Sequence, residues 1–182
     1  SAMGTFSGTL FAGTCGNDPQ MWASDEGTRW RPIGLLEPGA DPREAVPAIG
    51  SGNTACVTSM TEYDGWLYTA LGGALDPALD RSSQGGPVEV LRCRKCDGTD
   101  WDGAAAPGFG PRANNGHIAL AVFDEPPFRY LYAIVGNIKT GLEAWRAPDG
   151  KDWEQILVGG WGDDNNLVLG GGSAAAVYRG RL

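Results

Sequence analysis

The sequence has few basic residues and no long apolar stretch. Of its 182 residues, 14 are Lys or Arg and one is His, and these are scattered along the chain. A nucleic-acid-binding surface normally shows a basic stripe, so the composition excludes nucleic acid as a partner. No run of 18 apolar residues occurs, which excludes insertion into a membrane by such a segment. The net charge of −8 favours solubility.

Helical patterns are also missing. No window of 11 residues carries a convincing 3.6-residue apolar stripe, and the 29 Gly and 12 Pro would interrupt most helices. This Gly and Pro content follows no collagen period, and it accompanies 42% apolar residues and seven Trp, which argues against disorder. We therefore expect many short strands joined by tight turns.

One sequence pattern occurs three times along the chain. Each copy has a strand with a Leu-aromatic pair, a second apolar strand, and an Asp-containing turn that ends at a Trp. A further strand precedes the second and third copies, at residues 54–65 and 117–125, and recurs after the third copy at residues 173–180. Before the first copy only the end of this strand is kept, at residues 4–8. Alternation also favours strands: apolar and polar positions roughly alternate over residues 142–146, as a half-buried strand requires.

Four strands in a unit of roughly 50 to 65 residues are typical of a β-propeller blade. The sequence thus predicts an all-β fold with three four-stranded blades, over residues 4–53, 54–116 and 117–172. One such sheet cannot bury both faces alone, so neighbouring blades must pack face to face.

The turns resemble the Asp box, the Ser-x-Asp-x-Gly-x-x-Trp hairpin of sialidase-like propellers. Residues 23–30 have its full spacing with Ala23 in the leading place, and residues 97–101 and 149–153 are one residue shorter. Residues 140–166 resemble a repeat of exported bacterial propellers of unassigned activity. The resemblance implies turns at the outer edge of each blade, with the carboxylate accepting turn N–H groups and the Trp packing between sheets. The residues given this structural role are Asp25, Trp30, Asp97, Trp101, Asp149 and Trp153.

Three blades are too few for a closed ring, which usually has about four to eight. The first unit is expected to lack most of its first strand, and residues 173–182 have no downstream partner. Because unpaired strands favour aggregation, we expect a homodimer by head-to-tail strand exchange, with residues 173–182 completing the first unit of a partner in a six-bladed ring. The alternative is a piece of a longer protein. Residues 1–3 resemble a scar of tag cleavage, so a leader could have been removed.

The four cysteines bear on location and chemistry. An even number in a Trp-rich, acidic β chain favours an exported protein, secreted or in the cell envelope. Cys93 and Cys96 form a CxxC, which is compatible with half a zinc site, a redox pair or a local disulfide. Zinc needs two further ligands, and the other units have ordinary turn residues at this place. We therefore favour a local disulfide or free thiols over catalysis.

His117, the single His, begins an expected strand. A lone His near a loop could act as a base. However, the sequence places no Ser or Cys together with an acid around it. We therefore favour a residue at the edge of a strand, hydrogen-bonded to the backbone.

The loops that lead into the strands at residues 54–65, 117–125 and 173–180 are rich in Asn and Asp. Oxygen ligands of this kind suit calcium, although they are also common in plain turns, and no EF-hand spacing occurs. The long segments 34–52 and 73–87 are further candidates, because binding tends to occur on long loops of a rigid scaffold. The candidate binding residues are Asn53, Asn114, Asn115, Asp163, Asp164, Asn165 and Asn166.

For function we expect a non-enzymatic module that binds a carbohydrate or protein ligand, with no cofactor other than calcium. The first alternative is a sialidase-like hydrolase, which needs acids, arginines and a Tyr that no motif here brings together. The second alternative is a structural fragment without a ligand. Two acids and several Arg at the ring centre would favour the hydrolase. Gly, Ala and backbone amides there would favour the binding module.

Overall fold

The computed structural model describes residues 2–16, 19–33, 55–73, 87–110, 114, 116–137, 139–166 and 175–182. These residues form three antiparallel sheets and two short 3-10 turns, with no α-helix among them. The first sheet contains β1 (Ala2–Phe6), β2 (Thr9–Gly13), β4 (Met21–Ser24) and β5 (Arg31–Ile33). The second contains β6 (Ala55–Tyr63), β7 (Trp66–Gly73), β8 (Glu89–Cys93) and β9 (Asp102–Gly103), joined at its edge by β3 (Cys15–Gly16). The third contains β10 (Ile118–Glu125), β11 (Phe128–Asn137), β12 (Gly141–Ala147) and β13 (Glu154–Leu157). The 3-10 turns are η1 (Pro107–Phe109) and η2 (Gly159–Trp161).

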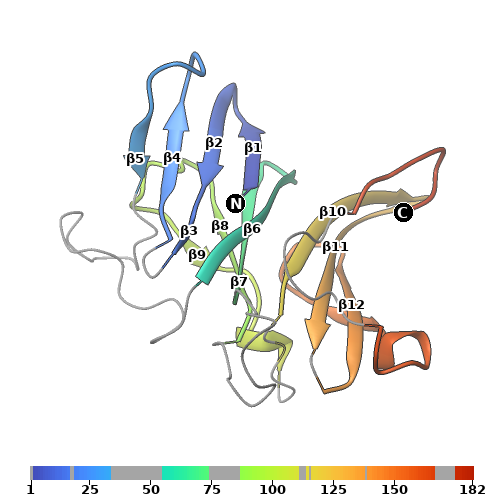
Figure 1. Ribbon diagram of the computed structural model, residues 1–182. Helices are drawn as coiled ribbons and strands as arrows, with labels where there is room; N and C mark the ends of the chain where they lie inside the picture. Colours follow the sequence, from blue (N-terminus) through green and yellow to red (C-terminus); the bar gives the residue numbers. More distant parts are fainter. Residues whose placement is uncertain are drawn as a thin grey trace.

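Each sheet runs up and down in chain order, apart from β3, which crosses from the first unit to pair with β6. The prediction of an all-β fold with three four-stranded units is confirmed. Figure 1 shows the second sheet between the first, at the left, and the third, at the right. No helix among the described residues has the length and apolarity needed to cross a membrane.

The repeated Leu-aromatic pair explains why the sheets pack face to face. Successive residues of a strand point to opposite faces, so the two members of each pair face different neighbours. Phe11 and Leu67 lie in the core between the first and second sheets. Tyr68 and Leu131 lie in the core between the second and third. Phe11 and Tyr68 therefore face the following sheet, and Leu67 and Leu131 face the preceding one.

The N-terminal strand differs from the expectation of an incomplete first unit. β1 pairs with β2 over its whole length, from Ala2 opposite Gly13 to Phe6 opposite Thr9. Residues 2 and 3 belong to this strand, and their origin as a scar of tag cleavage stays a prediction. The reason for the pairing is packing, because Ala2 and Phe6 contribute to the core against the second sheet.

The C-terminal residues form no strand of the expected kind. Of residues 173–182, those from 175 onward are described, and their backbone pairing is one bridge between Tyr178 and Arg181. The place in the first unit that this strand was expected to fill is taken by the chain's own β1. The six-bladed ring of two chains therefore stays a prediction.

Candidate functional site

Two loops occupy equivalent places in the second and third units. One contains η1 and Asn114, and the other contains η2 and Asn166. Each contains a 3-10 turn followed by an Asn whose side chain reaches back six residues. The Asn114 amide donates to the Gly108 carbonyl at 3.2 Å, and the Asn166 amide donates to the Gly160 carbonyl at 2.8 Å. The main-chain oxygen of each Asn accepts an N–H at the start of the third strand of its sheet, at 2.8 Å in both units. Asn114 and Asn166, two of the predicted binding residues, therefore stabilise the loops.

A buried polar cluster lies beside the first of these loops. The Glu143 carboxylate is fully buried, and its Oε2 accepts from the amides of Asn114, at 3.0 Å, and Gln155, at 2.9 Å. Its Oε1 accepts from the Thr140 hydroxyl at 3.3 Å. The Asn137 amide donates to Asn114 Oδ1 at 2.9 Å, which joins β11 to the same cluster. Glu143 is thus held by amide and hydroxyl donors away from solvent.

This cluster is absent from the sequence-based predictions. The strand at residues 142–146 is expected to be half-buried, whereas Glu143 is as fully buried as the apolar residues beside it in the strand, and its carboxylate reaches Asn114 of the second unit. The reason is that its donors come from a loop and from other strands, and strand alternation does not reveal them. The isolated acid in an apolar strand, with Asn at equivalent loop positions, is the signal that could have indicated the cluster.

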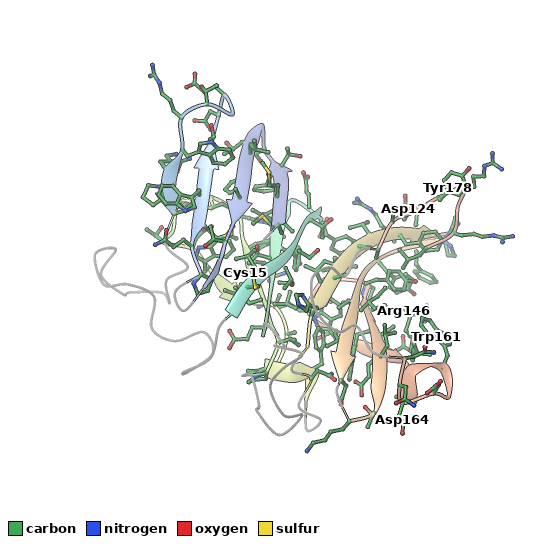
Figure 2. All side chains as sticks on the ribbon, in the orientation of Figure 1. Cys15, Asp124, Arg146, Trp161, Asp164 and Tyr178 are labelled. Atoms are coloured by element: carbon green, nitrogen blue, oxygen red, sulfur yellow. A yellow bond between two sulfur atoms is a disulfide. The ribbon has the colours of Figure 1, made fainter. Side chains whose placement is uncertain are left out.

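The loop after η2 carries the exposed candidate residues. Asp163 Oδ1 accepts from the backbone N–H of Asn165 at 2.8 Å and from its side-chain amide at 3.1 Å, an Asx turn. Asp163, Asp164 and Asn165 are exposed, and Figure 2 places Asp164 with Trp161 on this loop at the edge of the third sheet. Within the described part of the chain, no three His, Cys, Asp or Glu side chains are grouped to hold a metal ion. The calcium prediction stays a prediction.

Some candidates lie outside the described residues. These are Asn53, Asn115, the segment 34–52 and nearly all of the segment 73–87. The remaining candidates are divided between two loops: Asn114 belongs to the loop before β10, and the others to the loop after η2. The structure therefore joins Asp163 and Asn165 by hydrogen bonds and places Asn114 in a separate, equivalent position.

The Asp turns lie at the opposite end of the sheets. Asp97 Oδ1 accepts from the N–H of Thr99 at 3.0 Å and from its hydroxyl at 2.7 Å. Asp149 Oδ1 accepts from the N–H groups of Asp152, at 2.7 Å, and Lys151, at 2.8 Å. These hydrogen bonds lower the pKa of both carboxyls, because they favour the charged form. Both side chains thus act within their turns.

The first turn is built differently. Asp25 Oδ1 accepts from the Thr9 hydroxyl at 2.8 Å, while the Ser24 hydroxyl accepts the N–H of Gly27 at 2.8 Å. Asp25 therefore bonds to the neighbouring strand rather than to its own turn. The sialidase-like identity of the three turns stays a prediction.

The turn Trp residues pack between sheets where a preceding sheet exists. Trp101 is buried in the core shared with the first sheet. The indole N–H of Trp153 donates to the Ala104 carbonyl of the second unit at 2.8 Å. Trp30, before which the described residues form no further sheet, is only partly buried.

All four cysteines are bonded in two disulfides. Cys93 and Cys96 form one disulfide within the second Asp turn. Cys15 and Cys56, 41 residues apart, form another between β3 and β6. The sequence offered no spacing signal for the second pair, since the crossing of β3 to the second sheet brings them together. Neither pair has a thiolate available for metal binding or nucleophilic attack.

His117 is buried at the start of β10. Burial lowers the pKa of its imidazole, which favours the neutral form. A side chain at Gly72 would collide with the Gly116 carbonyl, so the two backbones meet closely next to the His117 main chain. No carboxylate among the described residues is bonded to the imidazole. This arrangement lacks the orienting acid of a catalytic His.

The first strands of neighbouring sheets lie side by side at the inner edge of the fold. The Thr58 hydroxyl donates to the Ile118 carbonyl at 2.7 Å, and the Ser59 hydroxyl accepts the N–H of Leu120 at 3.0 Å. β1, β6 and β10 otherwise carry mainly small or apolar residues. Their charged residues, Glu62, Asp124 and Glu125, lie near the end that carries the Asp turns.

The sequence matches no protein-family model, and it matches no curated protein. The structure is similar to a glycosyl hydrolase from Bacteroides ovatus, with a TM-score of 0.51 and 12% identity over 86% of this chain and 48% of that one. It is also similar to an exo-1,5-α-L-arabinanase from a bovine ruminal metagenomic library, with a TM-score of 0.50 and 17% identity over 84% of this chain and 50% of that one. A third similar structure is an α-L-arabinanase of Cellvibrio cellulosa, with a TM-score of 0.50 and 13% identity over 84% of this chain and 51% of that one. The chain spans about half the length of these structures, and the likeness shows a fold of the β-propeller type.

Proposed function

We propose that this chain is a ligand-binding module of propeller type that does not transform its ligand, and that the ligand is a carbohydrate. The observation that supports the absence of catalysis is the make-up of the three inner strands. Over β1, β6 and β10, the described residues are mainly small, apolar or hydroxyl-bearing, with no acid before Glu62 and Asp124. A glycosidase of the usual kind needs two carboxylates about 5 to 9.5 Å apart beside the scissile bond. Glu143, the buried acid nearest the loops, is engaged by three donors.

The carbohydrate class rests on two supports. First, the exposed loop after η2 presents Asp163, Asp164 and Asn165, whose carboxylate and amide oxygens accept hydrogen bonds from sugar hydroxyls. Second, the solved structures of similar fold are described as a glycosyl hydrolase and arabinanases. Because those descriptions belong to other proteins, a hydrolase is the second candidate function for this chain.

A binding experiment separates these functions. Titration calorimetry with arabinan-derived and other oligosaccharides is expected to give binding without release of reducing sugar. Asp164→Ala should weaken binding severalfold, whereas Asp124→Ala, an exposed Asp at the opposite end, should not. Release of product would favour the hydrolase, and no binding across a glycan array would contradict the carbohydrate proposal.

We also propose that the protein is exported. Two disulfides that involve all four cysteines suit an oxidising compartment. Mass spectrometry of protein from a culture of the source cells should find all four sulfurs oxidised, and protein found only in the cytosol with free thiols would refute export.

A further inference from the structure

The second and third units are joined by an aromatic contact. The Phe109 ring, at the end of η1, stacks on Trp145 with ring centroids 5.3 Å apart and planes inclined by 25°. The same ring meets Trp153 edge-on, with centroids 5.1 Å apart and planes at 88°. The loop of one unit thus inserts a ring between two Trp side chains of the next. Offset or edge-on pairs of this kind stabilise packing beyond the area that they bury.

Trp161 occupies the equivalent place in the loop of the third unit. Phe109 and Trp161 are each the last residue of a 3-10 turn, and both have a φ of 60°. Each precedes by five residues an Asn that ties its loop to a Gly carbonyl. Their surroundings differ, since Phe109 is 8% exposed and Trp161 is 70% exposed. Trp161 therefore has the backbone geometry of an inserted ring, but no sheet among the residues that the structure describes receives it.

The first sheet carries the matching pair of Trp side chains. Trp22 lies opposite Ala12 in the register of β2 and β4, just as Trp145 lies opposite Ala133 in β11 and β12. The neighbours of Trp22 along β4, Met21 and Ala23, belong to the core against the second sheet, so alternation turns Trp22 to the opposite face. Trp22 is only partly buried there.

Trp30 completes the pair. It ends the first Asp turn as Trp153 ends the third, and it too is only partly buried. By this equivalence, we infer that the first sheet presents, on the face turned away from the second sheet, the same two Trp positions that receive Phe109 in the third sheet. The third unit thus carries the exposed ring, Trp161, and the first sheet carries the pair that would receive it, Trp22 and Trp30.

We propose that two copies of this chain associate by inserting Trp161 of each copy between Trp22 and Trp30 of the other. The occupant is a second copy because the contact would continue an interface that the chain already builds between its second and third units. Exposed Ile156 and Val158, beside Trp161, supply further apolar surface, and exposed Met3 does so on the first sheet. The pairing differs from strand exchange, since it joins sheet faces and leaves β1 in place.

The first test is the mass in solution. Light scattering of the 182-residue chain at micromolar concentration is expected to give about twice 19.1 kDa. Trp161→Ala should raise the dissociation constant at least about thirtyfold for each of the two contacts, as truncation of a central interface Trp does. Trp161→Phe should retain the dimer, because Phe is the residue that the second unit uses at this place.

Tyr178→Ala is the matched control. Tyr178 is 68% exposed, nearly as much as Trp161, and lies in the C-terminal bridge. Its variant should remain dimeric. If Tyr178→Ala dissociates the dimer and Trp161→Ala does not, strand exchange by the C-terminal residues is the correct mode and the proposal is wrong.

A mixing experiment tests the receptor. Trp161→Ala and Trp22→Ala chains should each be monomeric, and their equimolar mixture should regain dimer, since one contact in the mixed pair is intact. A monomeric wild-type chain, or a Trp161→Ala chain that stays dimeric, would overturn the proposal. If Trp22→Ala does not fold, the comparison of Trp161→Ala with Trp161→Phe decides alone, because an exposed position leaves the fold intact.

Discussion

Phe109 and Trp161 form an internal pair for a stability measurement, because the same loop geometry has a receiving sheet in one unit and, within the described part of the chain, none in the other. Phe109→Ala removes a buried ring that contacts two Trp side chains. Truncation of a buried Phe to Ala costs about 3 to 5 kcal/mol, and the loss includes both ring contacts. Trp161→Ala removes an exposed ring, and surface changes usually alter stability by less than about 0.5 kcal/mol.

Urea unfolding followed by tryptophan fluorescence checks this difference. With an m-value of about 2 kcal/mol/M, a loss of about 3 kcal/mol lowers the unfolding midpoint by about 1.5 M. The measurement is made at a protein concentration at which each variant is monomeric, so that association does not contribute. If Phe109→Ala unfolds within about 0.3 M of the wild type, the ring does not join the second and third units as argued. An equal loss for Trp161→Ala would refute the assignment of that ring to an uncovered face.

The other predictions concern the buried cluster and an Asp turn. Glu143→Ala leaves the buried amide of Asn114 and the partly buried amide of Gln155 without their acceptor, so we expect a loss of about 3 kcal/mol in the free energy of unfolding, measured in urea. An unchanged midpoint would show that water or other groups replace the carboxylate. For Asp149, the N–H groups of the turn lower the pKa of the folded state below the ordinary value of 3.8. The stabilisation is therefore present above about pH 4 and is lost as the pH falls through the folded-state pKa, and Asp149→Asn should weaken this acid dependence of the thermal midpoint. A variant with the same acid dependence as the wild type would argue against the turn hydrogen bonds.

Much of the fold could be predicted because it depends on local patterns. The Leu-aromatic pair at Leu67 and Tyr68 predicts a strand with two buried faces, and both residues are fully buried in different cores. The Asp turn at Asp149 is likewise local, since its acceptor and donors lie within three residues. Alternation and short-range turn chemistry are enough to specify such features.

The candidate site was harder to predict because its residues have long-range partners. Asn114 lies in an Asn-rich loop, which suggests a binding residue. Its side-chain amide instead donates hydrogen bonds to the Gly108 carbonyl and to Glu143, 29 residues away. Cys15 and Cys56 are paired because β3 crosses to the second sheet. No local spacing encodes either partnership.

The amino-acid sequence alone determined the number of units, most of their strands and the Asp turns of the second and third units, because each depends on neighbouring residues in the chain. The tertiary structure decided which faces are covered. Trp145 and Trp22 occupy the same place in their sheets, but only Trp145 has a ring from the preceding unit stacked on it. Burial is set by what lies across the interface, and a repeated motif does not reveal whether its neighbour is present.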